Sequence, residues 1–410
     1  RLVGSEMCIR DRLLSDGMAG RPLPELSGRT TLEAAHTPVM DTLAKVSEIG
    51  MTSMVPKGMA PGSDTANLAV MGYDPKKYYT GRSPMEALSI GVDMADSDIS
   101  FRCNLVTLSE EEDAYEERTI LDHSSDEIST QEAEVLLSAV KERLVKEGYQ
   151  FYTGTSYRHL LIWKGGRVLE LTPPHDILTK KIGSYLPKDP VLREMMEKSY
   201  EILEHHPINE NRRKNGLKPA NSLWFWGAGT KPALTSFEKQ TGKKGVMISA
   251  VDLLKGIAIG AGMDCVCVEG ANGGLHTNYK GKALAAVQAL TEDGYDFAYI
   301  HVEAPDEMGH QGSAAHKIEA IEHVDKEVLG TVAEKLNQAG EDYRLLLLPD
   351  HPTPIEVRTH TGDPVPYLLY DSTKEQDGLV AYNEKTAETS GRYEEDGYRL
   401  IGHLLQEELC

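Results

Sequence analysis

The sequence has few cysteines and no long apolar run. Its five cysteines in 410 residues form an odd and sparse set, which is typical of a reducing compartment and predicts a cytoplasmic protein. No uninterrupted apolar stretch approaches the ~20 residues that a membrane-spanning helix needs. We therefore expect a protein without a membrane partner.

Positive charge is also scarce. Against 64 aspartates and glutamates the chain carries 43 lysines and arginines, so its formal net charge is −21. A nucleic-acid-binding protein needs a basic face, and this balance argues against that class. An anionic substrate would have to be met by arginine, lysine or a bound metal ion, because the chain as a whole repels it.

The first twelve residues, RLVGSEMCIRDR, lack an initiator methionine and carry three arginines. No apolar segment follows them, so they do not form a signal peptide. We predict that they are foreign to the protein, as translated sequencing adapter at a broken gene end would be. Since only Leu13 and Leu14 are then apolar before Asp16, we expect the first strand to be nearly absent and Asp16 to be poorly placed.

Hydrophobic patterning divides the chain into two kinds of segment. In the C-terminal half, apolar runs such as YDFAYIHVEA and YRLLLLPD alternate with helical segments, which is the pattern of βαβ units and a mostly parallel sheet. Earlier in the chain, an amphipathic helix at 129–148 and a hairpin at 151–171, turning at Gly165-Gly166, predict an α+β unit. We predict an α/β domain built from residues 1–96 and 216–410. A smaller insert at 97–215 interrupts it.

Polar side chains follow several of these strands, at the ends where ligands collect in open α/β sheets. Three aspartates and three histidines occupy such positions: Asp16, Asp306, His310, Asp350, His351 and His360. Each alone is explained as a helix cap or a satisfied histidine. Together, carboxylates and imidazoles without thiolates suit Mn²⁺, Zn²⁺ or Mg²⁺. Two metal ions sharing one site would suit phosphoryl transfer.

Ser63 stands in the run PGSDTANLAV. The Pro-Gly pair predicts a tight turn, and the apolar run after it predicts a helix. A hydroxyl at the N-terminus of a helix, bound to a metal, can lose its proton and attack phosphorus. The same serine can equally be an ordinary turn residue or helix cap, and the sequence alone leaves both open.

Longer motifs follow one another from about residue 14 to 370, among them DGMAGRPLPEL, PGSDTANLAVMGYDPKKYYTGRSPMEA, SAVDLLKGI, HVEAPDEMGH, DHPTP and THTGDPVP. In this order they resemble the cofactor-independent phosphoglycerate mutases of the archaeal type, within the alkaline phosphatase superfamily. The resemblance implies an alkaline-phosphatase-like three-layer α/β fold. It also implies interconversion of 3-phosphoglycerate and 2-phosphoglycerate in glycolysis and gluconeogenesis, without 2,3-bisphosphoglycerate.

The resemblance assigns roles to the polar residues. It implies two sets of metal ligands: Asp306, His310 and His360 in one, and Asp16, Asp350, His351 and the Ser63 oxygen in the other. Manganese is the expected metal, with Mg²⁺, Zn²⁺ or Co²⁺ as alternatives. Ser63 would accept the phosphoryl group, which leaves phosphoserine and bound glycerate, and Lys255 would contact the travelling group.

The insert would then orient the substrate. Its polar candidates are Arg102, Arg158, His159, His175 and Asp176. The planar fork of arginine donates two hydrogen bonds to a carboxylate or phosphate, which suits this task. His123 receives no role, because its stretch LDHSSDEIST is more acidic than the resemblance leads us to expect. The partner is thus a small molecule, and self-association into a homo-oligomer is left open.

Two other classes stay open at this stage. A metal-dependent phosphatase, or a phosphotransferase acting on another small phosphorylated substrate as a homoserine kinase does, would keep the metals. A phosphatase lets water attack the phosphoserine, whereas a mutase must exclude water until glycerate has turned. A non-catalytic metal-binding protein would tolerate the loss of Ser63. The arginines of the insert favour the mutase.

Overall fold

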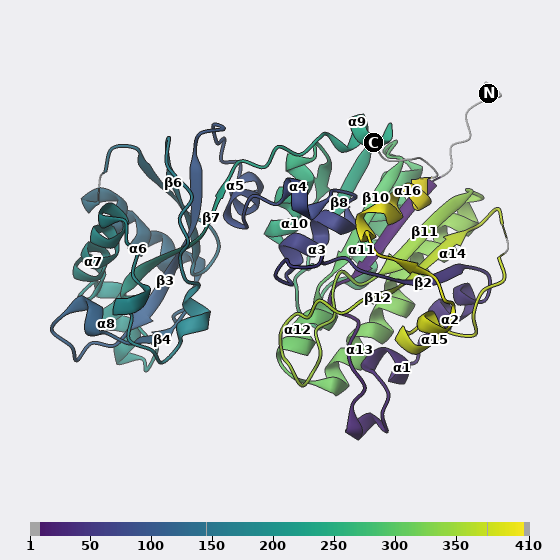
Figure 1. The fold of residues 1–410 in the computed structure, drawn as a ribbon, viewed down its shortest axis with the longest axis horizontal. Coiled ribbons are helices and arrows are strands. Elements are labelled where there is room, and N and C mark those ends of the chain that lie inside the picture. The colour runs from purple at the N-terminus through teal and green to yellow at the C-terminus, as the bar shows by residue number, and fades with distance from the viewer. Residues whose placement is uncertain (1–8, 145, 375, 406–410) are drawn as a thin grey trace. The chain divides into compact units, whose positions relative to one another are not determined.

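The computed structural model describes residues 9–144, 146–374 and 376–405 (Figure 1). The chain forms two compact units. The first contains the chain up to Tyr79 and from Ala233 onward, and the second is Thr80–Pro232. The second unit is therefore wider than the insert that we expected at 97–215. Among the described residues, no helix is both long enough and apolar enough to cross a bilayer.

The first unit is built on an eight-stranded sheet in the order β13-β2-β12-β11-β1-β10-β8-β9. Its strands are β1 (Ile9–Ser15), β2 (Glu48–Thr52), β8 (Gly245–Ile248), β9 (Asp264–Val266), β10 (Phe297–Val302), β11 (Tyr343–Leu348), β12 (Val365–Asp371) and β13 (Tyr393–Glu394). Only β12 runs antiparallel to its neighbours. The predicted α/β architecture with a mostly parallel sheet is confirmed.

Strand β1 lies near the middle of this sheet and corrects one expectation. Its backbone pairs in parallel with β10 on one side and with β11 on the other. The prediction of a nearly absent first strand is wrong, because a ladder needs paired backbone groups, and the seven residues of Ile9–Ser15 supply them. Asp16 is held at the end of this strand, where its N–H donates to the Val302 carbonyl at 2.9 Å. The rest of the suspect run, residues 1–8, lies outside the described residues.

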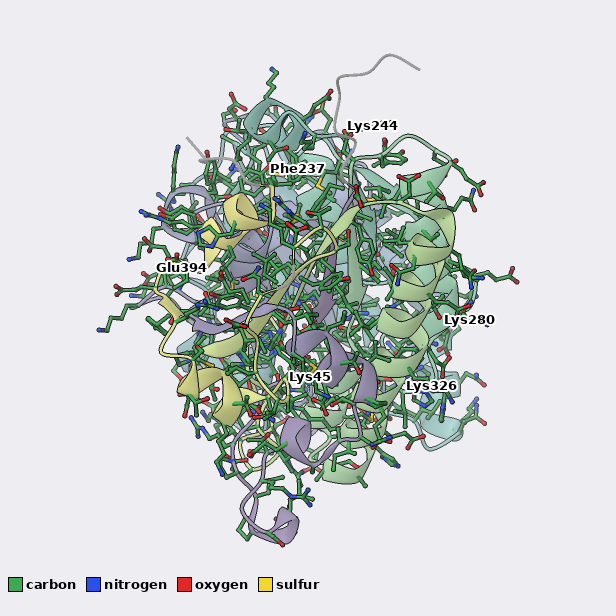
Figure 2. The ribbon with its side chains drawn as sticks, turned by 90° about the vertical axis from the view of Figure 1, so that its right-hand side faces the viewer. Lys45, Phe237, Lys244, Lys280, Lys326 and Glu394 are labelled. Atoms are coloured by element: carbon green, nitrogen blue, oxygen red, sulfur yellow. The ribbon has the colours of Figure 1, made fainter. Side chains whose placement is uncertain are left out.

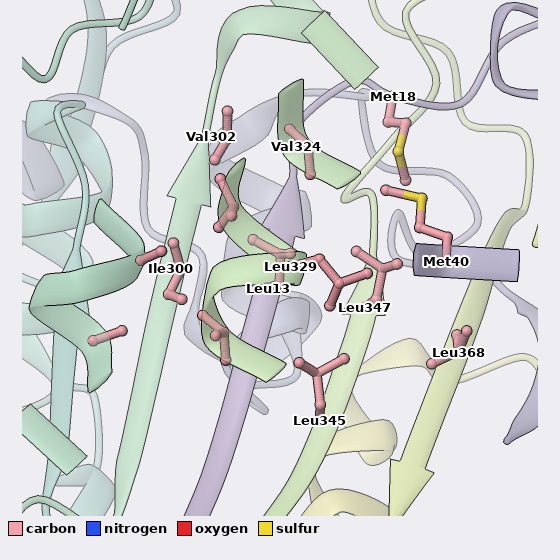
Figure 3. Close-up of a cluster of buried hydrophobic side chains, with 14 of the residues drawn as sticks. Leu13, Met18, Met40, Ile300, Val302, Val324, Leu329, Leu345, Leu347 and Leu368 are labelled. Atoms are coloured by element: carbon pink, nitrogen blue, oxygen red, sulfur yellow. The ribbon is translucent and has the colours of Figure 1, made fainter. Parts of the chain in front are cut away.

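Helices pack on both faces of the sheet, as the βαβ pattern predicts. One face carries α2 (Pro38–Ala44), α11 (Tyr279–Thr291), α13 (Ala314–His323) and α14 (Gly330–Ala339). Side chains from these helices and from alternate strand residues form the core there, with Leu13 and Leu347 at its centre (Figure 3). The outward side of this layer is polar, and Figure 2 shows Lys280 of α11 at its periphery.

The opposite face of the sheet is covered by α3 (Ser63–Val70) and α16 (Leu400–Leu405). The Tyr299 hydroxyl on β10 donates to Asn67 Oδ1 of α3 at 2.6 Å. Arg344 on β11 donates to the Leu404 carbonyl of α16 at 3.4 Å. Because the strands are buried on both faces, they appear in the sequence as continuous apolar runs rather than as alternating ones.

The second unit is an α+β structure with an antiparallel sheet. Its strands are β3 (Ile99–Leu108), β4 (Ile120–Asp122), β5 (Tyr149–Tyr152), β6 (Arg158–Trp163) and β7 (Ser222–Thr230). Helices α5 (Ser83–Ser89), α6 (Thr130–Arg143), α7 (Pro190–Leu203) and α8 (Pro207–Lys214) accompany them.

Two strand assignments in the second unit need correction. The expected bounds of the α/β domain, 1–96 and 216–410, include β7, but β7 pairs antiparallel with β3 over most of its length, and this pairing moves the domain boundary to Pro232. The predicted hairpin turns earlier than expected. Tyr149 pairs with Trp163 and Tyr152 with Leu160, so the chain reverses in the run TGTSY at 153–157 and not at Gly165-Gly166.

Candidate metal centre

The predicted metal ligands converge at one edge of the first unit. Strands β10, β1 and β11 are parallel neighbours, so their carboxyl ends meet. Asp16 follows β1, and Asp306 and His310 lie on α12 (Ala304–His310), just after β10. Asp350 and His351 follow β11, and His360 stands in the loop that leads to β12. Residues more than 300 positions apart in the chain are thereby brought together.

The first group of ligand atoms consists of Asp306, His310 and His360, whose atoms all lie within 4.8 Å of one another. His310 Nε2 is 3.1 Å from Asp306 Oδ2 and 3.0 Å from His360 Nε2. His310 Nδ1 lies 3.0 Å from the Arg358 carbonyl, which it reaches as a donor. This second hydrogen bond fixes the imidazole so that Nε2 faces the other two residues, as in many metal-ligating histidines.

The electrostatics of this group are set by the contact between His310 and Asp306. Burial disfavours the imidazolium, but the hydrogen bond and charge of Asp306 outweigh it and raise the pKa of His310 to about 9. Burial also disfavours the carboxylate, yet hydrogen bonds to His310 and His360 hold the pKa of Asp306 well below its usual range. A divalent cation binding here would have to replace the proton on His310.

The second group consists of Asp16, Asp306 and His351, all buried, with ligand atoms within 4.8 Å of one another. Asp306 thus contributes to both groups, where we expected Asp350 to complete the second. Asp350 lies beside it, with Oδ2 3.3 Å from His351 Nε2. Its oxygens accept hydrogen bonds from the Gly17 and His351 N–H groups and from Asn67 Nδ2.

The second group has the features of a cation site. Asp16 Oδ1 is buried and has no hydrogen-bond partner among the described residues, an arrangement that is costly in a protein interior. Burial, followed by the negative charges of Asp350 and Asp306, raises the pKa of Asp16 well above its usual range. A divalent cation would relieve both penalties. The donors are carboxylates and imidazoles without thiolates, so they fit Mn²⁺, Mg²⁺ or Zn²⁺.

Ser63 is the first residue of α3, and Gly62 is the N-cap in an extended conformation. Ser63 Oγ lies 3.1 Å from His351 Nε2, which places the hydroxyl beside the second ligand group. Asn67, one turn later, donates through Nδ2 to the Ser63 carbonyl at 2.9 Å and to Asp350 Oδ2 at 2.8 Å. The helix predicted for this run is confirmed, whereas the turn predicted at Pro61-Gly62 is wrong, because Gly62 is extended and the chain turns earlier, at Lys57-Gly58. The hydroxyl faces the second ligand group.

Lys255 lies on α10 (Asp252–Gly260), which follows β8 at the same edge of the sheet and packs against α3. Its ammonium group is 3.3 Å from Asp252 Oδ1. The structure places Lys255 on a neighbouring element of the centre, outside both ligand groups.

Three residues that the sequence analysis missed support the centre. His301 on β10 is fully buried, with Nε2 2.9 Å from Asp16 Oδ2. Burial, followed by the charge of Lys282, lowers the pKa of His301 to about 3. The Thr353 hydroxyl donates to Asp306 Oδ1. Lys317, also fully buried, donates to the Thr353 carbonyl at 2.8 Å. A polar residue within an apolar strand run, as in AYIHV, was the available signal for His301.

In the second unit, Arg102 and His175 share one aromatic neighbour. The Arg102 guanidinium lies over the Trp226 ring at 4.4 Å, and its Nε is 2.9 Å from Glu86 Oε2. Burial lowers the pKa of Arg102 to about 10, against the opposing effect of Glu86. The His175 ring packs edge-on against Trp226 at 5.3 Å and lies 6.0 Å from the ring of His123. His123, which received no role from the sequence, therefore belongs to the same cluster.

The remaining predicted substrate residues are not all together. Arg158 and His159 are consecutive on β6, so their side chains point to opposite faces of the sheet. Arg158 is exposed over the Tyr157 ring, whereas His159 is buried and its Nδ1 accepts the Gly154 N–H at 3.1 Å. His159 thus packs into the face of the sheet opposite to Arg158 and bonds within its own hairpin. Asp176 is exposed beside His175.

Comparisons with known proteins agree with this architecture. A family model for 2,3-bisphosphoglycerate-independent phosphoglycerate mutase matches residues 44–209. The chain is 44% identical over 398 residues to the probable enzyme of that name from Geobacter sulfurreducens, covering 96% of this chain and 98% of the relative. It is 45% identical over 400 residues to the Methanosarcina mazei enzyme, with the same coverage.

Two solved structures extend the comparison. The cofactor-independent phosphoglycerate mutase from Thermoplasma acidophilum superposes with a TM-score of 0.63 at 27% identity, over 97% of this chain and 99% of that one. The PH0037 protein from Pyrococcus horikoshii gives a TM-score of 0.80 at 30% identity, over 97% of both chains. The fold is thus that of the cofactor-independent phosphoglycerate mutases, which are isomerases. By sequence, the chain belongs to the 2,3-bisphosphoglycerate-independent phosphoglycerate mutase family, and the resemblance noted in its motifs is confirmed.

Proposed function

We propose that this protein interconverts 3-phosphoglycerate and 2-phosphoglycerate through a phosphoserine on Ser63, at a centre that holds two divalent metal ions and needs no 2,3-bisphosphoglycerate. The observation that carries the proposal is the position of the Ser63 hydroxyl, 3.1 Å from His351. Around it stand two groups of buried or half-buried ligand atoms that share Asp306. Membership of the mutase family names the substrate class.

In this proposal each ligand group would hold one ion. Asp306, His310 and His360 would hold one, and Asp16, Asp306 and His351 would hold the other, with Asp350 and Ser63 beside it. Manganese is the proposed metal, and Mg²⁺, Zn²⁺ or Co²⁺ could replace it. When bound, such ions would supply the positive charge that the chain lacks and lower the pKa of a coordinated hydroxyl.

The chain's own residues would carry out the transfer. Ser63 Oγ forms a bond to phosphorus as the bond between phosphorus and the C3 oxygen of the substrate breaks. The serine loses a proton and the departing glycerate gains one on that oxygen. N–H groups at the start of α3 would hold the phosphoryl oxygens, and Lys255 would contact the same group. Glycerate then turns, and its 2-hydroxyl takes the phosphoryl group back from Ser63.

The second unit would bind and turn the glycerate. Arg102, Arg158, His175 and Asp176 are the proposed contacts, with His123 added because it packs against His175. His159 is assigned to the hairpin instead. Glycolysis and gluconeogenesis, in the cytoplasm, are the setting in which this isomerisation would serve.

A coupled assay for 2-phosphoglycerate tests the proposal. The protein is supplied with 3-phosphoglycerate and Mn²⁺ without 2,3-bisphosphoglycerate, and Ser63→Ala is measured alongside. We expect turnover in the parent and none in the variant, while Ser390→Ala, which changes a serine outside both ligand groups, keeps full activity. Release of inorganic phosphate in place of 2-phosphoglycerate would assign the chain to the phosphatases. Full activity of Ser63→Ala would remove Ser63 from the reaction.

A further inference from the structure

A chain of polar side chains runs through the apolar interior directly behind Asp16. His301 Nε2 lies 2.9 Å from Asp16 Oδ2, and His301 Nδ1 lies 3.2 Å from Ser249 Oγ. Ser249 Oγ in turn accepts the N–H of Val251 at 3.0 Å. His301 is fully buried and Ser249 is 5% exposed. The chain joins the ends of three strands, β1, β10 and β8.

Only one proton arrangement satisfies this chain when Asp16 is ionised. A carboxylate accepts hydrogen bonds and donates none, so the proton of the neutral imidazole must be on Nε2. His301 Nδ1 then accepts, and the Ser249 hydroxyl donates to it. The lone pairs of the same hydroxyl accept the Val251 N–H. Each group has a partner, and each partner fixes the orientation of the next.

The two oxygens of Asp16 are consequently in different situations. Oδ2 is tied inward to His301, whereas Oδ1 has no hydrogen-bond partner among the described residues and lies 3.6 Å from His351 Nε2. The position of His301 is itself secured, because its carbonyl accepts a hydrogen bond from the fully buried Lys282 at 3.0 Å. The carboxylate of Asp16 is thus turned so that its free oxygen faces the second ligand group.

We propose that His301, held by Ser249, is a positioning residue that aims Asp16 at the second metal ion, an inference that rests on the two-metal centre of the proposed function. Through Val251, the N-cap of α10, the same chain ties Asp16 to the start of the helix that carries Lys255. Among the described residues, no hydrogen bond joins His301 or Ser249 to the first ligand group, in which His310 and His360 stand. The effect should therefore be confined to one of the two ions.

Two variants at His301 separate positioning from simple packing. His301→Leu fills the space but removes the N–H donor, whereas His301→Gln keeps an N–H donor near Asp16. Removing a hydrogen-bond partner of a metal ligand typically weakens metal binding 10–100-fold. We expect His301→Leu to weaken the binding of one Mn²⁺ ion by this factor and to leave the affinity for the other unchanged. We expect His301→Gln to recover most of the lost affinity.

The experiment is a titration of the metal-free full chain with Mn²⁺, in which free Mn²⁺ is followed by electron paramagnetic resonance. The control is Thr241→Val, which removes a buried hydroxyl bonded to the Phe237 carbonyl at 2.7 Å, within the same unit. This control should bind both ions as the parent does. In the mutase assay with saturating metal, His301→Leu should lower kcat more than it raises KM, because it contacts no substrate.

The outcomes are distinguishable. A parent chain that binds fewer than two ions overturns the proposed two-metal centre itself. A parent that binds two ions, together with a His301→Leu variant that binds both with unchanged affinity, overturns the role of His301 alone. If His301→Leu does not fold, Ser249→Ala decides. This variant removes the hydrogen bond to His301 Nδ1 and should weaken binding of the same Mn²⁺ ion severalfold. Unchanged affinity in Ser249→Ala likewise refutes the inference.

Discussion

Metal binding to the group of Asp306, His310 and His360 should depend steeply on pH. The contact of His310 Nε2 with Asp306 Oδ2 at 3.1 Å favours a protonated imidazole and raises its pKa to about 9. A metal ion must displace that proton before it can take Nε2. At pH 7 the site lies two pH units below this pKa, so on the order of one molecule in a hundred has a neutral His310. Apparent affinity should therefore be about a hundredfold weaker at pH 7 than above pH 9, changing about tenfold per pH unit.

Calorimetric titration of the metal-free protein between pH 6 and pH 8, in two buffers with different ionisation enthalpies, measures both the affinity and the protons released. We expect close to one proton released per ion at this group below pH 8. His310→Gln should bind more weakly and lose the pH dependence, while His205→Gln, an exposed histidine of the second unit, should keep it. An affinity that stays constant across this range, with no proton released, would refute the proposed pairing of His310 and Asp306.

Three further predictions concern stability. Without metal, the Tm of the protein should fall as pH rises from about 6.5 to about 9. His310 has its ordinary pKa of about 6.5 in the unfolded chain and a pKa of about 9 in the folded one, so the unfolded chain loses its proton at lower pH. A flat Tm profile by differential scanning fluorimetry in the presence of a chelator contradicts this. Burial, with Glu327 and Glu48 as the next causes, raises the pKa of Tyr279 and Tyr367 above the ordinary value, so stability should fall above about pH 10. The part of the phenolate absorbance at 295 nm that Tyr279→Phe and Tyr367→Phe remove should appear in the parent only together with unfolding, and its appearance in folded protein would show that these two residues are accessible. Lys317→Met leaves the buried carbonyls of Ala19 and Thr353 without their donor and should lower the free energy of unfolding by about 1–3 kcal/mol in urea titration. The control Lys326→Met, at an exposed lysine (Figure 2), should change it by less than about 0.5 kcal/mol. Equal effects of the two substitutions would contradict the argument.

The local sequence pattern identified most strands of the first unit. It failed for strands that are defined by their backbone pairing with other strands rather than by their own residues. The run YRLLLLPD is apolar because β11 is buried on both faces, and such runs are easy to recognise. Strand β1 begins within an arginine-rich run that has no strand pattern, and only its backbone register with β10 and β11 defines it. The run SLWFWGA of β7 has the composition of a central parallel strand. Its antiparallel partner, β3, lies more than a hundred residues earlier, and no local feature encodes that choice.

In the candidate site, too, some features could be predicted from the sequence and others could not. Residue chemistry and the strand-end rule were sufficient to select Asp306, His310 and His360, because a parallel sheet brings strand ends together whatever the details. The partition of neighbouring carboxylates between two sites was not predictable. It depends on which oxygens are already occupied, and those of Asp350 accept hydrogen bonds from Gly17 and Asn67. Side-chain directions of this kind exist only in the folded chain.

The two ligand groups differ in how they balance charge, and in the proposed two-metal centre this difference would give the two ions different tasks. In the first group, His310 neutralises Asp306 with a proton of its own, so a cation there exchanges with that proton. In the second, burial and the charge of Asp350 act on Asp16 without any such compensation, and His301 offers Asp16 a hydrogen bond but no charge. A cation is therefore most strongly required beside Asp16. Since the Ser63 hydroxyl also lies at this second group, an ion bound there would be the one that acts on Ser63 in the proposed reaction.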